Sequence, residues 1–181
     1  MKNSRNARRY AEALYDVAKE HEHEDQIERE LLTVRQVFSA PSELVDFLQD
    51  PKQWMNRARI IKSTFMTFSS ELVKLLLIMV EDHAEQDVPG MVDHYTYLIN
   101  EKRGVGVGKV YSVTHLTPHQ LEDIEAHFAE RFGYKRLALQ NEIDERVIGG
   151  FKVVINNRVY DASLKAKLED VRRKFVPLYK R

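Results

Sequence analysis

The chain has 181 residues, with 28 Lys and Arg against 28 Asp and Glu, so its formal net charge at pH 7 is zero. Hydrophobic residues make up 43% of it, enough to form a folded core, and this composition excludes an intrinsically disordered protein. The chain contains no cysteine, which excludes disulfides, thiolate metal ligands and a cysteine nucleophile.

No leader and no membrane-spanning segment are expected. The first 20 residues mix acidic and basic side chains and lack the continuous apolar core of a secretory signal. The most apolar stretch, residues 72–80, is interrupted by Lys74 and is much shorter than the roughly 20 residues that a transmembrane helix needs. We therefore expect a soluble chain.

Six helices are expected in the first part of the chain, because apolar residues recur there at helical spacing. These residues lie within 7–18, 27–38, 44–48, 54–68, 70–80 and 91–99. The fifth segment, ELVKLLLIMVED, is apolar on nearly all sides, which predicts a central position with neighbours on most sides. Short connections between the six helices predict a helical bundle that ends at Gly104.

After Gly104 the apolar residues change from helical to alternating spacing. KVYSVTHL, residues 109–116, predicts a strand. The next four residues, 117–120, form a capping box with proline at the first helical position, and they open a helix that ends at Gly133. A second strand is expected over residues 137–143.

The remaining residues predict a hairpin and a last helix. GFKVVINNRVYD has two asparagines, Asn156 and Asn157, that suit the positive φ angles of a tight two-residue turn. Apolar residues then recur at intervals of four, three and four, at Leu164, Leu168, Val171 and Phe175. Either Asp161 or Ser163 is expected to cap this helix.

The expected fold class is α+β, with an N-terminal six-helix bundle over residues 1–103 and a small β-α-β-β-α domain over residues 104–181. The zero net charge hides an asymmetry between these parts. Residues 1–103 carry 14 basic and 18 acidic side chains, a net −4, whereas residues 104–181 carry 14 and 10, a net +4. This pattern argues against a protein that simply coats nucleic acid or anionic membrane.

The segment Gly104-Val105-Gly106-Val107-Gly108 followed by Lys109 invites comparison with a phosphate-binding loop. Such a loop needs a strand before it and a helix N-terminus after it, whereas here a helix precedes and a strand follows. We therefore interpret the segment as a flexible joint between the two domains.

No pattern of residues predicts an enzyme. His21 and His23 are two residues apart, which places them on different faces of a helix, and the start of a helix separates His115 from His119. No arrangement typical of a nucleophilic triad is visible in the sequence. A hydrolase stays open as a hypothesis because triads are assembled in space. We expect no catalytic residue, no metal and no cofactor.

The last helix carries a run of basic residues, which has two interpretations. It could bind an acidic partner or nucleic acid, or it could be a solvated face with cations near a helix C-terminus. The first interpretation makes a two-domain RNA-associated regulatory protein the alternative function. The acidic N-terminal part and the lack of interleaved aromatic residues count against this alternative. The cations concerned are Lys165, Lys167, Arg172, Arg173 and Lys174.

Segments at opposite ends of the chain resemble one known family. ARRYAEALYDVA, residues 7–18, resembles the first helix of the delta subunit of F-type ATP synthases, called the oligomycin-sensitivity-conferring protein in mitochondria. VIGGFKVVINNRVYDASLKAKLEDVRRKF, residues 147–175, resembles the C-terminal signature of the same family. Two departures occur: the family usually has Asp-Gly-Ser where this chain has Asp161-Ala162-Ser163, and Gly-Asp where it has Asn156-Asn157.

The resemblance implies a non-catalytic stator subunit. In that family the helical domain binds the N-terminal segments of the alpha subunits of the catalytic head, and the C-terminal domain binds the b subunits of the peripheral stalk. The protein resists rotor torque during ATP synthesis or hydrolysis coupled to ion transport. It would lie at the cytoplasmic face of a bacterial cell membrane, associated with it only through the complex. Neither direct nucleic-acid binding nor a small-molecule substrate is implied.

The resemblance also nominates site residues. Candidates for the groove that binds the alpha N-terminus lie on the first and fifth expected helices: Tyr10, Ala13, Leu14, Val17, Leu75, Ile78 and Met79. All seven could instead be core residues, an interpretation of at least equal weight for Leu75 and Ile78, whereas the groove is favoured for Ala13 and Val17. The signature residues are interpreted as structural first, through hairpin geometry and helix capping: Ile148, Gly149, Gly150, Asp161, Ser163 and Leu164.

Overall fold

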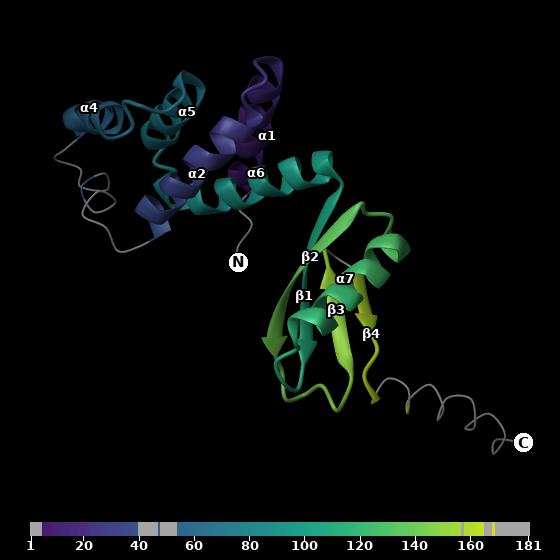
Figure 1. The fold of residues 1–181 in the computed structure, drawn as a ribbon. Coiled ribbons are helices and arrows are strands. Elements are labelled where there is room, and N and C mark those ends of the chain that lie inside the picture. The colour runs from purple at the N-terminus through teal and green to yellow at the C-terminus, as the bar shows by residue number, and fades with distance from the viewer. Residues whose placement is uncertain (1–4, 40–46, 48–53, 157, 165–167, 169–181) are drawn as a thin grey trace, which may run out of the picture. The chain divides into compact units, whose positions relative to one another are not determined.

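The computed structural model describes residues 5–39, 47, 54–156, 158–164 and 168 (Figure 1). The chain divides into two compact units, unit 1 (Met1–Ile99) and unit 2 (Asn100–Arg181). This division falls four residues before the expected boundary at residue 103. The last turn of the helix that ends at Arg103 therefore belongs to unit 2, and within this unit Tyr134 Oη donates to Glu101 Oε1 at 3.5 Å.

Unit 1 is helical in all of its described elements. These are α1 (Arg5–Glu20), α2 (Glu24–Ser39), α4 (Trp54–Thr64), α5 (Ser70–Glu81), the short 3-10 helix η2 (Glu85–Asp87) and α6 (Val88–Arg103). Five of the six expected α-helices are therefore present. The third, expected around residues 44–48, lies outside the described residues except for Phe47, so the count of six stays a prediction. Within the described part of the chain, no helix is both long and apolar enough to span a bilayer.

The core of unit 1 is built from one face of each helix. Its largest fully buried side chains include Tyr95, Phe65 and Ile27. The α5 helix is less enclosed than its composition predicts: Leu72 and Leu76 are completely buried, but Lys74 and Ile78 are exposed. An apolar sequence on nearly all sides therefore does not give a helix with neighbours on nearly all sides.

In its described residues, unit 2 is a four-stranded sheet with the helix α7 packed against it; the expected last helix lies outside them except for Leu164 and Leu168. Its elements are β1 (Val105–Ser112), α7 (Pro118–Phe132), β2 (Arg136–Ile143), β3 (Phe151–Ile155) and β4 (Arg158–Asp161). The strand order is β2-β1-β3-β4; β1 runs parallel to β2, and the other neighbouring pairs are antiparallel. The α+β fold class is confirmed. The β-α-β-β-α description was one strand short, because the hairpin contributes two strands.

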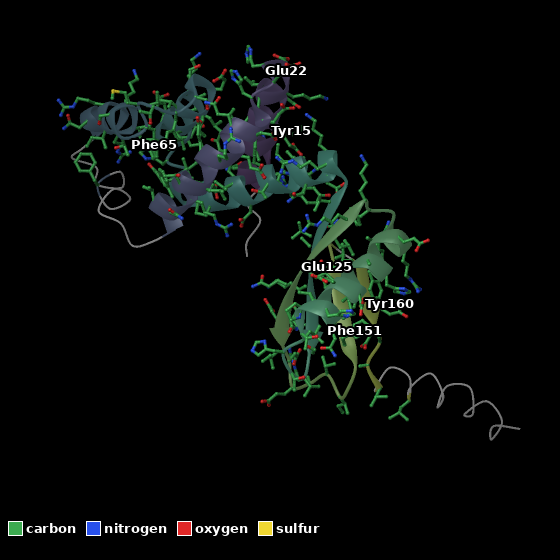
Figure 2. All side chains as sticks on the ribbon, viewed as in Figure 1. Tyr15, Glu22, Phe65, Glu125, Phe151 and Tyr160 are labelled. Atoms are coloured by element: carbon green, nitrogen blue, oxygen red, sulfur yellow. The ribbon has the colours of Figure 1, made fainter. Side chains whose placement is uncertain are left out.

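The α7 helix begins as its sequence predicts. Thr117 Oγ1 accepts a hydrogen bond from Gln120 N at 3.3 Å, and Gln120 Oε1 accepts one from Thr117 N at 2.9 Å. Gly133 ends the helix in the left-handed conformation, with φ 76°. On the buried side of α7, the ring of Phe128 lies 4.8 Å from that of Tyr160 and 6.2 Å from that of Phe151. Figure 2 labels these two residues of the sheet, Phe151 and Tyr160.

The interpretation of residues 104–108 as a flexible joint is wrong. Residues 105–108 form the first half of β1 and pair with β2, and Gly108 also pairs with Ile155 of β3. A Cβ atom on Gly108 would lie 2.5 Å from the Val154 carbonyl oxygen, and one on Gly106 would overlap Leu137 and Tyr134. Both positions face crowded surroundings, so glycine is required there for close packing rather than for mobility.

Candidate partner-binding surface

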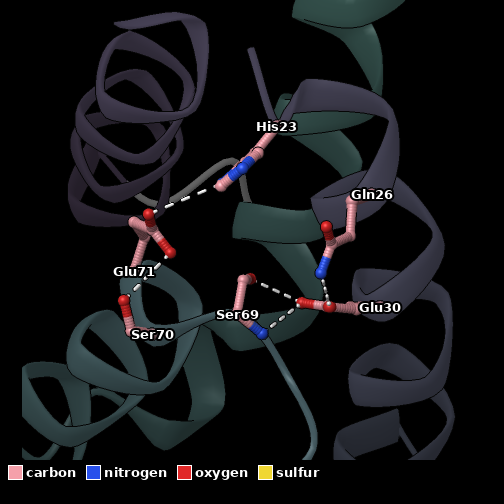
Figure 3. Close-up of polar contacts among 6 residues, drawn as sticks. All are labelled: His23, Gln26, Glu30, Ser69, Ser70 and Glu71. Atoms are coloured by element: carbon pink, nitrogen blue, oxygen red, sulfur yellow. Dashed lines mark hydrogen bonds and ion pairs between the residues drawn. The ribbon is translucent and has the colours of Figure 1, made fainter. Parts of the chain in front are cut away.

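Helices α1 and α5 pack side by side and are joined by polar contacts at both ends. Near the start of α1, Tyr10 Oη donates to Asp82 Oδ2, just beyond the end of α5, at 2.7 Å. Just beyond the end of α1, His23 Nδ1 lies 3.6 Å from Glu71 Oε1 in the first turn of α5 (Figure 3). Because the start of one helix meets the end of the other, α1 and α5 are antiparallel.

Three of the seven residues nominated for the groove lie in the core of unit 1. Leu14 is 3% exposed, Leu75 is 8% exposed and Met79 is completely buried. Their side chains pack among those of α1, α2, α4, α5 and α6. The structure therefore supports the core interpretation for these three residues.

The other four nominated residues lie at the surface. Tyr10 is partly buried, Ala13 is exposed, and Val17 and Ile78 are 39% and 49% exposed. On α1 they follow one another at intervals of three and four, so they share one side of the helix. Ile78 lies one turn before Asp82, which places it on the side of α5 that meets Tyr10. We call Tyr10, Ala13, Val17 and Ile78 the α1–α5 surface.

The polar contacts at the two ends of the helix pair also set the charge states there. The hydrogen bond to Asp82, followed by burial, raises the pKa of the Tyr10 hydroxyl, which is therefore neutral at pH 7. A hydrogen bond from its own backbone N–H, assisted by the Ser70 hydroxyl and His23, lowers the pKa of Glu71. Glu71 is therefore ionised at the N-terminus of α5, where the helix dipole favours a negative charge.

The N-terminus of α5 is also held by α2. Glu30 Oε2 accepts hydrogen bonds from Ser69 N at 2.9 Å and Ser69 Oγ at 2.6 Å, and Gln26 Nε2 donates to Glu30 Oε1 at 2.9 Å (Figure 3). A carboxylate from another helix thus satisfies the backbone N–H of Ser69, the residue before α5. Helical spacing of apolar residues gives no signal for Glu30 or Asp82, because both are polar.

The signature residues of unit 2 form one tight junction between the start of β3 and the chain that follows β4. Leu164 N donates to the Gly149 carbonyl oxygen at 3.1 Å, and Ser163 N donates to Asp161 Oδ1 at 2.9 Å. Gly149 and Gly150 have φ angles of 66° and 76°. A Cβ atom on Gly149 would lie 2.6 Å from Leu164 Cδ1, which agrees with a structural role.

The signature residues differ in exposure and backbone conformation. Ile148 and Leu164 are 62% and 53% exposed, whereas Ser163 is buried. Asn156 has φ 52°, as expected for the hairpin turn; Asn157 lies outside the described residues. Ala162 is not among the residues with positive φ, so alanine fits where the family usually has glycine.

The histidines do not gather into a metal site in the described part of the chain, where no group of three or more His, Asp or Glu side chains is placed to hold a metal ion. His119 Nδ1 instead lies 3.0 Å from Asp123 Oδ2 at the surface of α7. His21 and His23 have ring centroids 6.1 Å apart.

Comparison with known proteins gives matches over nearly the whole chain. The family model described as the ATP synthase delta (OSCP) subunit matches residues 7–175. A protein named ATP synthase subunit delta from Geobacillus sp. (strain WCH70) is 36% identical over 171 residues, which cover 94% of this chain and 96% of the relative. Proteins of the same name from Priestia megaterium and Bacillus subtilis (strain 168) are 37% and 34% identical, over 92% and 96% of this chain and 93% and 96% of the relatives.

A solved structure shows the same fold. A chain in the cryo-EM structure of the Toxoplasma gondii mitochondrial ATP synthase hexamer matches with a TM-score of 0.72. The match covers 94% of this chain and 97% of that chain, at 16% sequence identity. The α-helical and mixed α/β elements therefore occur together in both proteins.

Proposed function

Because the chain belongs to the ATP synthase delta (OSCP) subunit family, we propose that it is the non-catalytic stator subunit that links the catalytic head of an F-type ATP synthase to its peripheral stalk. Unit 1 binds the N-terminal segments of alpha subunits, and unit 2 binds the b subunits. The subunit thereby resists the torque of the rotor. It reaches the cytoplasmic face of the cell membrane only through the complex.

The observation that carries the proposal is the α1–α5 surface. Ala13, Val17 and Ile78 are exposed and apolar, and they lie along two helices whose relative position is fixed at both ends. A partner helix recognises such a surface through apolar residues at intervals of three and four. Because the two host helices are already held together, little conformational freedom is lost when the partner binds.

The proposal is tested by titrating the purified chain with a peptide that copies the N-terminal segment of a cognate alpha subunit. Val17→Asp and Ile78→Asp should each weaken binding at least about tenfold, since a carboxylate would be buried against apolar groups. Both side chains are exposed, so thermal melting should change little. Isothermal titration calorimetry and circular dichroism measure the two effects separately.

Leu32→Asp is the matched control for these variants. Leu32 is 53% exposed on α2, so the same change from an apolar to an acidic side chain occurs outside the α1–α5 surface. Peptide affinity should stay at the wild-type value. Equal weakening by Leu32→Asp, or undiminished binding by Val17→Asp and Ile78→Asp, would contradict the assignment of the surface.

Tyr10→Asp gives a less direct test of binding. It removes the hydrogen bond to Asp82 and places a second carboxylate beside it, so it weakens the packing of α1 on α5 as well as any partner contact. We expect it to abolish peptide binding. The loss must be interpreted together with a measured change in stability.

The binding of unit 2 to the stalk is tested with the full chain and a soluble segment of a cognate b subunit. Val17→Asp and Ile78→Asp should leave this affinity unchanged, because both residues belong to unit 1. In membranes, the chain should co-purify with the synthase and be lost when the catalytic head is stripped. Absence of b-subunit binding by the wild-type chain would reject this half of the proposal.

A further inference from the structure

The β2 strand lies at one edge of the sheet in unit 2. The strand order is β2-β1-β3-β4, so within the described residues β2 has a neighbouring strand on one side only. Asp144 N donates to the Ser112 carbonyl oxygen at the end of β1, at 2.9 Å. Backbone groups alternate in direction along a strand, so Leu137, Leu139 and Asn141 direct their N–H and C=O groups away from β1, out of the sheet.

A side chain from α7 covers the middle of this free edge. Glu125 Oε1 accepts a hydrogen bond from Leu139 N at 2.6 Å, and Figure 2 labels Glu125. Glu125 is partly buried and comes from the turn of α7 that also buries Ile124 and Phe128. The backbone N–H that a neighbouring strand would use is therefore bound by a carboxylate of the same chain, and hydrogen bonds to charged acceptors are the stronger kind.

The two edges of the sheet differ in their need for such a cover. The β2 strand has eight residues, whereas β4, at the other edge, has four. A short edge strand offers few backbone groups to another chain, and a long one offers a template for strand addition. The carboxylate thus lies at the edge that has more backbone groups to protect.

The charges of β2 are complementary to those of a second β2 strand. If two copies pair antiparallel with Leu139 opposite Leu139, residues at equal distances on either side of this position meet. Arg136 then lies opposite Glu142 of the second copy, and twofold symmetry repeats this pairing. Both side chains lie on the sheet face turned away from α7, since Leu137 and Leu139 between them are buried on the other face. Opposite charges directly across two strands stabilise their pairing.

We propose that Glu125 guards the free edge of β2 and prevents this edge from pairing with a second copy of the chain. Pairing centred on Leu139 requires that both copies move Glu125 away from the Leu139 N–H. Each copy then loses a hydrogen bond to a charged group and covers a carboxylate with another strand, and both changes oppose association. This proposal does not depend on the stator assignment.

Sedimentation equilibrium of the purified full chain tests the proposal. Glu125→Ala removes the acceptor but keeps a good helix former in α7, so circular dichroism should show a retained fold. We expect its dimer dissociation constant to be at least about tenfold lower than that of the wild type, because pairing no longer displaces a hydrogen bond to a charged group. Glu125→Gln keeps an acceptor oxygen and should behave as the wild type. Glu122→Ala is the matched control, since Glu122 is exposed on the same helix.

The register of the dimer is tested in the Glu125→Ala background. Arg136→Glu would place two carboxylates opposite each other, so it should raise the dissociation constant at least about fivefold. Arg158→Glu makes the same change of charge on β4, at the other edge of the sheet, and should leave the dissociation constant unchanged.

Hydrogen exchange at the Leu139 amide gives a measurement that does not require dimerisation. At low protein concentration, NMR should show exchange at least about tenfold faster in Glu125→Ala than in the wild type, because the amide has lost its acceptor. An unchanged exchange rate would overturn the proposal, as would a Glu125→Ala variant that stays monomeric although its Leu139 amide exchanges faster. Equal dimerisation of Glu122→Ala, or a dimer that Arg136→Glu does not weaken, would also overturn it, because the contact would then lie on another surface.

Discussion

The hydroxyl of Tyr10 donates a 2.7 Å hydrogen bond to the carboxylate of Asp82, and this bond sets the level at which α1 lies beside α5. One turn before Asp82, about 6 Å along the antiparallel α5, is Ile78. About the same distance beyond Tyr10 on α1 are Ala13 and Leu14. The bond therefore brings the exposed side chains of Ala13 and Ile78 to one level along the helix pair.

Removing the Tyr10 hydroxyl should cost a small but measurable part of the stability. Tyr10→Phe should lower the free energy of unfolding by about 1 kcal/mol, since a bond to a charged acceptor is lost at a partly exposed site. A double-mutant cycle with Asp82→Ala, measured by urea denaturation, gives the coupling energy. We expect about 0.5–1.5 kcal/mol. A coupling near zero would show that the bond does not hold the two helices together.

Replacing nominated groove residues by alanine should distinguish those that lie in the core from those that lie at the surface. Leu14→Ala should lower the free energy of unfolding by about 2–4 kcal/mol, because Leu14 is 3% exposed and its loss leaves a cavity. Ile78→Ala should cost less than about 1 kcal/mol, because its side chain is half exposed. Chemical denaturation of both variants measures the difference. Similar losses would mean that Ile78 is also a core residue.

The sequence predicted the helices of unit 1 better than the surface that they leave open. Helical spacing shows that Leu14 and Val17 lie on nearby sides of α1, but burial depends on where the neighbouring helices pass. That information comes from contacts between residues far apart in the chain, such as Tyr10 with Asp82. Capping at Thr117 was predictable because it is local, within four residues.

The first half of β1 was missed for a different reason. In Val105–Gly108 the positions that face α7 are glycines, so the alternation of apolar and polar side chains that marks a strand is absent. Glycine is common in joints, and only the packed sheet shows that Gly106 and Gly108 lie against other groups. A sequence pattern shows which side chain a position carries, but it does not show that neighbouring groups leave no room for a larger one.

Alanine at Gly108 should therefore destabilise unit 2. A Cβ atom there would lie 2.5 Å from the Val154 carbonyl oxygen, and a backbone atom in the middle of a sheet cannot easily move aside. We expect Gly108→Ala to lower the free energy of unfolding by about 2 kcal/mol or more. Gly133→Ala is the control: it has a positive φ but no atom within 4 Å, so strain alone should cost about 1 kcal/mol. A harmless Gly108→Ala would restore the interpretation as a joint.

The capping box of α7 should contribute to stability as a reciprocal pair. Thr117→Ala should cost about 1 kcal/mol, because Gln120 N loses its acceptor at the helix N-terminus. Gln120→Ala should cost less, since the Thr117 N–H that it leaves free is exposed to water. Thermal denaturation of the two single variants and the double variant checks whether the losses add. Full additivity would show that the two hydrogen bonds act independently.

Tyr95 should make unit 1 sensitive to alkaline pH. It is completely buried, its Oη donates to the Glu24 carbonyl oxygen at 3.3 Å, and burial raises its pKa well above the usual value of about 10. A group whose pKa is higher in the folded state contributes stability that is complete below its unfolded pKa. That contribution is lost as the pH rises towards and through the folded pKa. Above about pH 10, Tyr95 should therefore remove up to about 1.4 kcal/mol of stability per pH unit.

Tyr95→Phe isolates this effect. At pH 7 the variant should lose only about 1 kcal/mol, because the ring stays buried and one long hydrogen bond is removed. Between about pH 10 and 11.5 its free energy of unfolding should fall less steeply than that of the wild type, and the two curves should converge or cross. Tyr97→Phe, at a position that is 41% exposed, is the control for the loss of a tyrosine hydroxyl. If a buried tyrosine ionises only in the unfolded chain, the free energy of unfolding must fall more steeply with pH when that tyrosine is present. Parallel curves for the wild type and Tyr95→Phe would therefore show that the ionisation of Tyr95 is not linked to unfolding.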